Sequence, residues 1–283
     1  MSAFCFSSSS TQTCARVDRP GTRPLSGVRV QRLRLAMGTW VAIEATAPTG
    51  SKAVAAIDSA CRAITDVERS MHPRGEGSDL ARINSAAPGT RVPIADSTWH
   101  VLRLGWSVHA LSEGAFDPCL PSQPGRLPDL TLSAPDAGSR WALCRVPLAL
   151  DLGGIAKGYA IDRAIAALLA AGCSGGFVNA GGDLSVYGRA EGVLLRRADG
   201  TCTPLGLENA ALAVSDLELD ARHRPVEHQG YYCRSGPLSP RQRYAAVVAP
   251  RAAIADALTK CVLLADARCA ARALRAFRAR RVD

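Results

Sequence analysis

Two glycines and a lysine lie close together in DLGGIAKGYAIDRA, residues 151–164, between an apolar segment and a helical pattern. Gly153 and Gly154 allow the backbone to approach a ligand closely, and the free N–H groups of a helix start point into the same space. The ammonium group of Lys157 adds a mobile positive charge there. This combination is suited to an oxyanion such as phosphate, but glycines and a lysine are also common at strand-to-helix corners that bind nothing.

The glycine pattern matches neither of the two common nucleotide-binding signatures. The sequence G-x-x-x-x-G-K-[ST] is absent, and the second glycine cluster, NAGGD at 179–183, is not G-x-G-x-x-G. We expect this second cluster at the end of the next strand, where it adds a tight turn and the carboxylate of Asp183. The spacing alone leaves both phosphate binding and a purely structural corner open.

A third group of polar residues, Asp256, Thr259 and Lys260, lies in the stretch APRAAIADALTKCVLLAD. Spacings of three and four residues place these side chains on one face of a helix. They fit a site for a hard metal ion or phosphate at the beginning of that helix, or an Asp–Lys pair at the surface beside a buried helix. Taken by itself, the segment favours the surface pair.

Hydrophobic spacing predicts the elements that position these residues. Residues 30–47 alternate apolar and polar side chains, which indicates two antiparallel strands around a turn at Gly38. Helical spacing predicts a helix that starts from an N-cap at Ser51, a short helix in SDLARIN at 78–84, and a helix within 97–117 that Gly114 ends.

The second half of the chain starts with a predicted proline-rich loop at 118–140 and a buried strand in RVPLALDL at 145–152. A helix then follows the glycine turn, and a strand follows at 175–188. The predicted apolar stripe of this helix consists of Ile161, Ile165, Leu168 and Leu169.

Composition narrows the class of protein. A chain of 283 residues with 47% hydrophobic residues can bury a substantial core, and it has no apolar run of about 18 residues that would span a membrane. Residues 1–27 lack the apolar region of a secretory signal and an apolar run before Cys14, so we expect a disordered leader and a cytoplasmic protein.

Charge and cysteine content do not point to a further ligand. The ten cysteines are scattered without C-x-x-C spacing, which predicts reduced and mostly buried thiols rather than disulfides or structural zinc. The net charge of +9 includes an arginine-rich C-terminal segment, which we interpret as a solvated basic helix. No recognised nucleic-acid-binding module accompanies this charge, so we expect no nucleic-acid partner.

Six motifs in order along the chain resemble those of the ApbE-type FAD:protein FMN transferases. They are MGT at 37–39, SDLARIN at 78–84, GAFDP at 114–118, DLGGIAKGYAID at 151–162, NAGGDL at 179–184 and ADAL at 255–258. The resemblance and the mixed pattern of elements both imply an α+β fold with mixed and antiparallel sheets and packed helices. We expect one such domain over residues 28–283.

The resemblance also implies a set of site residues. Those that would bind FAD are Met37, Ala115, Phe116, Asp117, Asp151, Lys157 and Asp183. Those that would hold Mg²⁺ on the diphosphate are the Gly154 carbonyl, the Asp256 carboxylate and the Thr259 hydroxyl. Asp256, Lys157 and His223 are the residues expected to act in catalysis.

The reaction implied is attack by a threonine hydroxyl of an acceptor flavoprotein subunit on the FMN-side phosphorus of FAD. AMP leaves, and FMN becomes attached through a phosphoester. Two alternatives stay open: hydrolysis of FAD to FMN and AMP with water as the nucleophile, and binding of FAD without turnover.

Two departures from the family pattern concern the metal and the flavin. Lys260 stands where many members have a metal-binding threonine, and a fixed ammonium beside Asp256 predicts weakened dependence on Mg²⁺. The segment MHPRGEGSD at 71–79 lacks the aromatic residue that often stacks on the isoalloxazine, so we expect His72 or Arg74 to cover that face.

A third departure concerns the catalytic base. The His-x-x-Asp-Pro segment of the family is not recognisable, and the imidazoles nearest to its expected position are His223 and His228. A base must come within hydrogen-bond reach of the acceptor hydroxyl, which sequence does not establish.

Overall fold

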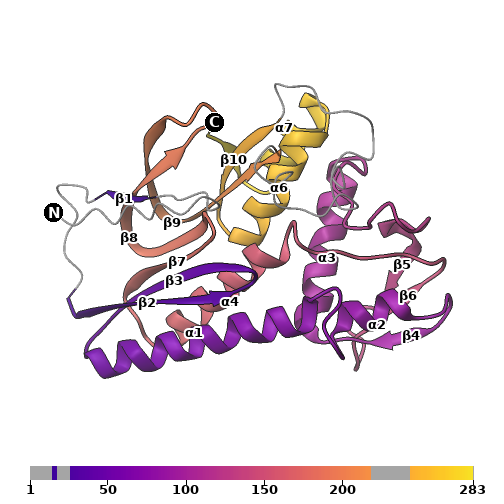
Figure 1. Ribbon diagram of the computed structural model, residues 1–283, viewed down its shortest axis with the longest axis horizontal. Helices are drawn as coiled ribbons and strands as arrows, with labels where there is room; N and C mark the ends of the chain where they lie inside the picture. The colour runs from indigo at the N-terminus through magenta and orange to yellow at the C-terminus, as the bar shows by residue number, and fades with distance from the viewer. Residues whose placement is uncertain (1–14, 18–25, 218–242, 283) are drawn as a thin grey trace.

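The computed structural model describes residues 15–17, 26–217 and 243–282, and its largest element is an antiparallel sheet (Figure 1). The strand order is β11-β10-β9-β8-β7-β3-β2, and β1 also pairs with β8. The strands are β1 Ala15–Val17, β2 Val28–Ala36, β3 Thr39–Ala47, β7 Gly175–Ala180, β8 Asp183–Arg196, β9 Cys202–Asp216, β10 Tyr244–Ala249 and β11 Arg280–Arg281.

Three helices cover one face of this sheet: α1 Gly50–Met71, α4 Ala156–Ala170 and α6 Ala252–Leu264. Helix α1 packs on β2 and β3, α6 packs on β9 and β10, and α4 contacts both helices as well as β7 and β8. Helices α4 and α6 approach each other closely at Gly158, where a Cβ atom would lie 2.3 Å from the carbonyl oxygen of Ala252. Only glycine permits this approach.

The opposite face of the sheet carries a second, smaller core. The strands β8 and β9 are long, and their register shifts between Val186 and Ala190, where Gly188 has a φ of +80°. Because of this bulge the outer halves of both strands bend back over the sheet. As a result Val193 and Leu195 pack with Leu184 and Leu212 in one buried cluster.

The middle of the chain forms a smaller layer beside the end of α1 (Figure 1). It contains α2 Asp79–Ser85, α3 Asp96–Leu111, the 3₁₀ helix Leu127–Asp129 and a three-stranded sheet in the order β4-β6-β5. These strands are β4 Arg91–Pro93, β5 Leu130–Leu132 and β6 Trp141–Cys144. Helix α7, Ala267–Ala276, contacts both α3 and α6.

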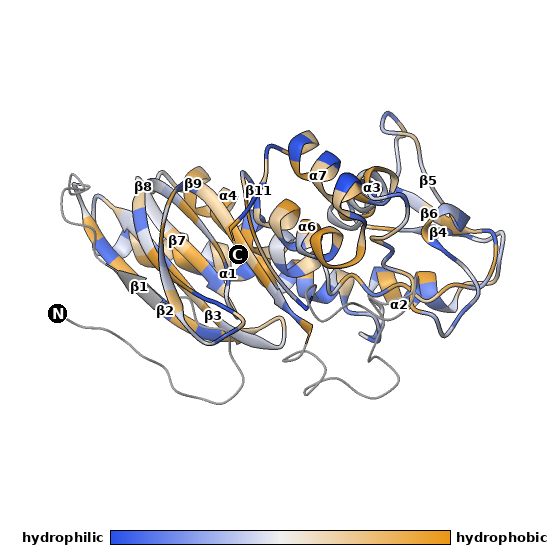
Figure 2. Cartoon of the chain, turned by 90° about the horizontal axis from the view of Figure 1, so that it is seen from above, coloured by the Kyte–Doolittle hydropathy of each residue, from blue (hydrophilic) through white to orange (hydrophobic). Residues whose placement is uncertain are grey.

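The predicted α+β class is confirmed, and so are several elements. The strands around Gly38 form a hairpin whose two-residue turn, Met37 and Gly38, has positive φ at both positions, as a type I′ turn requires. The helices predicted after the glycine turn and in SDLARIN are present. Helix α7 keeps Cys269, Ala270 and Ala273 buried and is hydrophilic on its outer side in Figure 2, as expected for a solvated basic helix.

Other details of the sequence prediction are wrong. The N-cap of α1 is Thr49 rather than Ser51, because the Thr49 hydroxyl accepts the Lys52 N–H at 3.3 Å. The segment 118–140 is more than a loop, since it contains the 3₁₀ helix and β5. The strand at 175–188 is a hairpin of β7 and β8, and Leu169 is 53% exposed rather than part of the apolar stripe.

The predicted strand at 145–152 is also wrong, for a reason that involves a motif. Leu150 forms an isolated antiparallel bridge with Cys119 rather than a strand ladder. Its N–H donates to Asn84 Oδ1 at 2.7 Å, and its carbonyl accepts from Asn84 Nδ2 at 3.0 Å. The side-chain amide of Asn84, from SDLARIN, therefore satisfies the Leu150 backbone in place of a second neighbouring strand. The segment stays extended and leads directly into the glycine turn.

The remaining sequence predictions are tested only in part. None of the helices in the described part of the chain combines the length and hydropathy needed to span a lipid bilayer. Within the segment 1–27, predicted as a leader, β1 is the strand that the structure describes. The described cysteines are free thiols, and all but Cys61 and Cys202 are buried.

Candidate functional site

Lys157 and Asp183 meet where the start of α4 lies against the β7–β8 turn. Gly181 and Gly182 both have positive φ and form this turn, so that β8 begins at Asp183. The Lys157 ammonium lies 2.9 Å from Asp183 Oδ2, and Asp183 Oδ1 accepts the Val214 N–H at 3.0 Å. The carboxylate is buried and the lysine side chain is partly exposed, so solvent reaches this ion pair from the lysine side.

A second ion pair lies beside the first, between Asp256 and Lys260 of α6. The Lys260 ammonium lies 2.5 Å from Asp256 Oδ1, and Asp256 Oδ2 accepts the Gly158 N–H of α4 at 3.2 Å. Asp256 is 1% exposed and Lys260 is 6% exposed. The sequence-based preference for an Asp–Lys pair at the surface is therefore wrong, because α6 is buried between the sheet and α4.

We call Lys157, Asp183, Asp256 and Lys260 the charged quartet. Burial raises the pKa of Asp183; the Lys157 ammonium opposes this rise, the Asp256 carboxylate adds to it, and Lys260 lowers it. All four groups thus act on one another in a region where water screens little. The two ammonium groups and two carboxylates form one electrostatic unit, although about a hundred residues separate Lys157 from Asp256 and Lys260 in the sequence.

The other predicted metal-site residues border this quartet. The Thr259 hydroxyl donates to the Asp256 carbonyl at 2.7 Å and lies 2.7 Å from Ser215 Oγ on β9. Gly154 lies against the side chain of Lys260, whose Cε would be 3.2 Å from a Cβ at that position. The structure therefore brings together Gly154, Asp256 and Thr259, with Lys260 among them.

The predicted flavin-site carboxylates Asp117 and Asp151 lie on neighbouring segments. The Asp151 N–H donates to the Pro118 carbonyl at 2.9 Å, and Asp151 Oδ1 accepts the Gly153 N–H at 2.7 Å. Asp117 Oδ1 accepts the Cys119 N–H at 2.9 Å. Asp151 thus shapes the glycine turn that precedes Lys157.

Ala115 and Phe116 lie on the turn after α3, next to α6 and α7. Phe116 is buried, its N–H donates to Ser112 Oγ, and its ring faces Gly105 of α3. Ala115 packs against the small cluster of Ala265, Cys269 and Ala270. Of this pair, Phe116 contributes to the core, and Ala115 is partly exposed.

Met37 lies in the β2–β3 turn, where its N–H donates to Glu68 Oε1 of α1 at 2.8 Å. Thr39, two residues after Met37, contacts Gly181, since a Cβ at Gly181 would be 2.7 Å from Thr39 Oγ1. The Met37 turn therefore neighbours the turn that leads into Asp183. His72 follows Glu68 by about one helical turn, and its Nδ1 accepts the Arg74 N–H at 3.2 Å. His223 and His228 lie outside the described residues.

Sequence reasoning missed Asp162, which holds α4 and α6 together with Asp256. Its carboxylate accepts the N–H groups of Ala252 at 2.7 Å and Ala253 at 3.1 Å, at the start of α6. Asp256 of α6 in turn accepts the N–H of Gly158, in the first turn of α4. Each helix thus supplies a carboxylate that caps the start of the other. Burial raises the pKa of Asp162, and the two backbone donors lower it.

The donor set does not fit a magnesium ion in this arrangement. Mg²⁺ needs free oxygen ligands in octahedral geometry. Both carboxylate oxygens of Asp256 already have a donor, and one of these donors is a cation. The Thr259 hydroxyl is also hydrogen-bonded on both sides.

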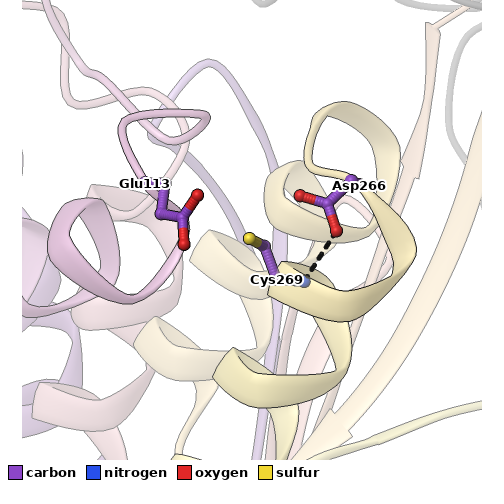
Figure 3. Close-up of side chains that lie close together, drawn as sticks. All are labelled: Glu113, Asp266 and Cys269. Atoms are coloured by element: carbon purple, nitrogen blue, oxygen red, sulfur yellow. Dashed lines mark hydrogen bonds between the residues drawn. The ribbon is translucent and has the colours of Figure 1, made fainter.

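Glu113, Asp266 and Cys269 form another acidic group, with ligand atoms within 4.8 Å of one another (Figure 3). Asp266 is the N-cap of α7, and its carboxylate accepts the N–H groups of Arg268 and Cys269. Arg272 pairs with Glu113 at 2.9 Å. Hydrogen bonding to Asp266, together with burial, raises the pKa of the Cys269 thiol to about 11. Capping of α7 and the ion pair account for this group.

Comparison with known proteins identifies the family and the fold of this chain. Residues 37–123 and 126–281 match the sequence model of the ApbE family. The fold is similar to that of the flavin transferase ApbE from Vibrio cholerae, with a TM-score of 0.72 and 18% identity over 89% of this chain and 92% of that chain.

Two further solved structures are similar. The flavinyl transferase ApbE from Pseudomonas stutzeri has a TM-score of 0.73 and 18% identity, over 89% of each chain. The ApbE protein from Thermotoga maritima has a TM-score of 0.66 and 21% identity, over 83% of this chain and 87% of that chain. A search of the curated proteins gave no match. Since the family match extends over most of the sequence, and the fold agrees with it, this chain belongs to the ApbE family.

Proposed function

We propose that this protein is an FAD:protein FMN transferase, which moves FMN from FAD to a threonine hydroxyl of an acceptor flavoprotein subunit. The observation that carries the proposal is the charged quartet beside the glycine turn at 153–155. A diphosphate brings negative charge that must be neutralised before a nucleophile approaches phosphorus. Membership of the ApbE family and the likeness to flavin transferases of that family support the same activity.

Lys157 is the group we assign to the diphosphate. Its side chain is partly exposed, and its ammonium is held by Asp183, which is itself fixed by the Val214 N–H. A flexible ammonium can turn from this carboxylate to a phosphate oxygen without moving the backbone. Asp151 and Asp117 border the same turn and would orient the flavin side of FAD, together with Met37, Ala115 and Phe116.

The proposed step balances as a substitution at phosphorus. The threonine oxygen bonds to the FMN-side phosphorus, the phosphoanhydride bond to AMP breaks, and the hydroxyl proton leaves the threonine. His223 is the residue that the sequence suggests as acceptor of this proton, and it lies outside the described residues. We assign no step to magnesium, because the Asp256 and Thr259 oxygens that would hold it already have hydrogen-bond partners.

One experiment tests this function and separates the alternatives. The purified protein is incubated with FAD and a threonine-containing acceptor, and the acceptor mass and the free nucleotides are measured. A gain in mass equal to FMN supports the transferase; free FMN and AMP alone would instead show a hydrolase, and unchanged FAD would show a binding protein.

Lys157→Ala provides the matching structural test. Loss of a charge-assisted contact to the diphosphate costs about 2–4 kcal/mol, which is roughly a 30- to 1,000-fold loss of FAD affinity. Lys52 is exposed on α1, so Lys52→Ala is the control and should bind FAD like the wild type. An unchanged FAD affinity in Lys157→Ala would refute the assignment.

A further inference from the structure

Lys260 fixes a positive charge inside the site that a divalent cation would otherwise occupy. Its ammonium contacts Asp256 Oδ1 at 2.5 Å, and its alkyl chain runs past Gly154. Asp256, Thr259 and Gly154 are the three residues that the family resemblance assigns to the metal. The side chain of Lys260 therefore contacts two of the three expected metal-site residues, Asp256 and Gly154.

The Lys260 side chain is packed too tightly to move away from Asp256. Lys260 is 6% exposed, and its whole helix is buried from Ala252 to Leu263. Its partner Asp256 is also fixed, because Asp256 Oδ2 accepts the Gly158 N–H where α4 and α6 lie close together. A divalent ion at Asp256 would have to displace a buried cation or stand beside it, and like charges in a poorly screened region repel strongly.

The choice of lysine is itself informative in this sequence. The chain has 34 lysines and arginines, and three of them are lysines: Lys52, Lys157 and Lys260. Two of the three lie in the charged quartet. An ammonium is a compact point charge, like a metal ion, whereas a guanidinium is a wide planar fork. The site thus holds compact cations, whereas the rest of the protein uses arginine at every basic position except Lys52.

We propose that the Lys260 ammonium takes the place of a divalent cation, so that this protein binds the diphosphate of FAD without Mg²⁺. The inference rests on the proposed function, since it assumes that FAD is the ligand. The buried Lys260 neutralises Asp256, and the partly exposed Lys157 meets the phosphate oxygens. Each carboxylate of the quartet therefore has a cation beside it when the diphosphate binds.

The first test measures FAD affinity in EDTA and in millimolar MgCl₂, for the wild type, Lys260→Thr and the control Lys52→Thr. We expect the wild-type and control dissociation constants to change by less than about twofold between the two conditions. In Lys260→Thr, Asp256 has lost its cation, so FAD affinity should fall by about tenfold or more in EDTA and recover in Mg²⁺. A wild-type affinity that falls tenfold in EDTA would overturn the proposal, and this result needs no folded variant.

The second test measures Mn²⁺ binding by electron paramagnetic resonance without FAD. The wild type should show no Mn²⁺ site at micromolar ion, and Lys260→Thr should gain one. A tight Mn²⁺ site in the wild type would refute the inference. If FAD binds to none of the proteins, the proposed function fails, and the Mn²⁺ titration still decides whether Lys260 excludes a divalent ion.

Discussion

Gly158→Ala should destabilise the protein, although alanine is the better helix former. A Cβ at position 158 would lie 2.3 Å from the Ala252 carbonyl oxygen and 2.7 Å from the Ala253 nitrogen. Both are backbone atoms at the start of α6, so a rotamer change cannot relieve the clash. Helices α4 and α6 must separate by about 1 Å to restore ordinary contact.

Three contributions set the change in the free energy of unfolding that we expect for Gly158→Ala. Overpacking of a close interface costs about 1–3 kcal/mol. Separation of the helices also lengthens the 3.2 Å bond between the Gly158 N–H and Asp256, and loss of a buried bond to a charged group costs about 1.5–3 kcal/mol. The higher helix propensity of alanine stabilises the variant by about 1 kcal/mol and offsets part of this loss. The net loss of unfolding free energy is about 1.5–5 kcal/mol.

Urea unfolding of wild type and variant measures this loss, and FAD titration measures the effect on the site. Gly105→Ala is the matched control, because Gly105 is also a helical glycine, and a Cβ there would lie 3.7 Å from the Phe116 ring, an ordinary contact. The control should be neutral or slightly more stable. If Gly158→Ala unfolds at the same urea concentration as the wild type, the close approach of α4 and α6 is wrong.

The remaining predictions concern pH and reactivity. Burial raises the pKa of Asp162, so the folded state keeps this proton to higher pH than the unfolded chain. Its contribution to stability is therefore full below about pH 4 and is lost as the pH rises through the folded pKa. Urea midpoints measured against pH should lose this part of the pH dependence in Asp162→Asn. A profile identical to that of the wild type would argue against this role of Asp162. Burial also raises the pKa of the Cys261 thiol to about 12. Iodoacetamide at mildly alkaline pH should modify exposed Cys202 and spare Cys261 until urea unfolds the protein, and equal labelling rates in the folded protein would contradict this.

Local sequence signals predicted those elements whose structure depends on near neighbours. The hairpin at Met37 and Gly38 follows from alternation and a turn glycine, and α4 follows from helical spacing after Gly154. The failures arose where a distant group replaced a local one. The extended segment before Asp151 is held by the amide of Asn84, more than sixty residues away, and no pattern within the segment encodes that partner.

The sequence by itself determined the family motifs, the α+β class and the presence of Lys157, Asp183, Asp256 and Lys260, because residue types, spacing and order are written in the chain. Only the tertiary structure decided that the Asp256–Lys260 pair is buried, and that Asp162 and Asp256 cap each other's helices. The physical reason is burial: helical spacing shows that two charges share a face, but the packing of that face against α4 and the sheet sets how strongly they interact.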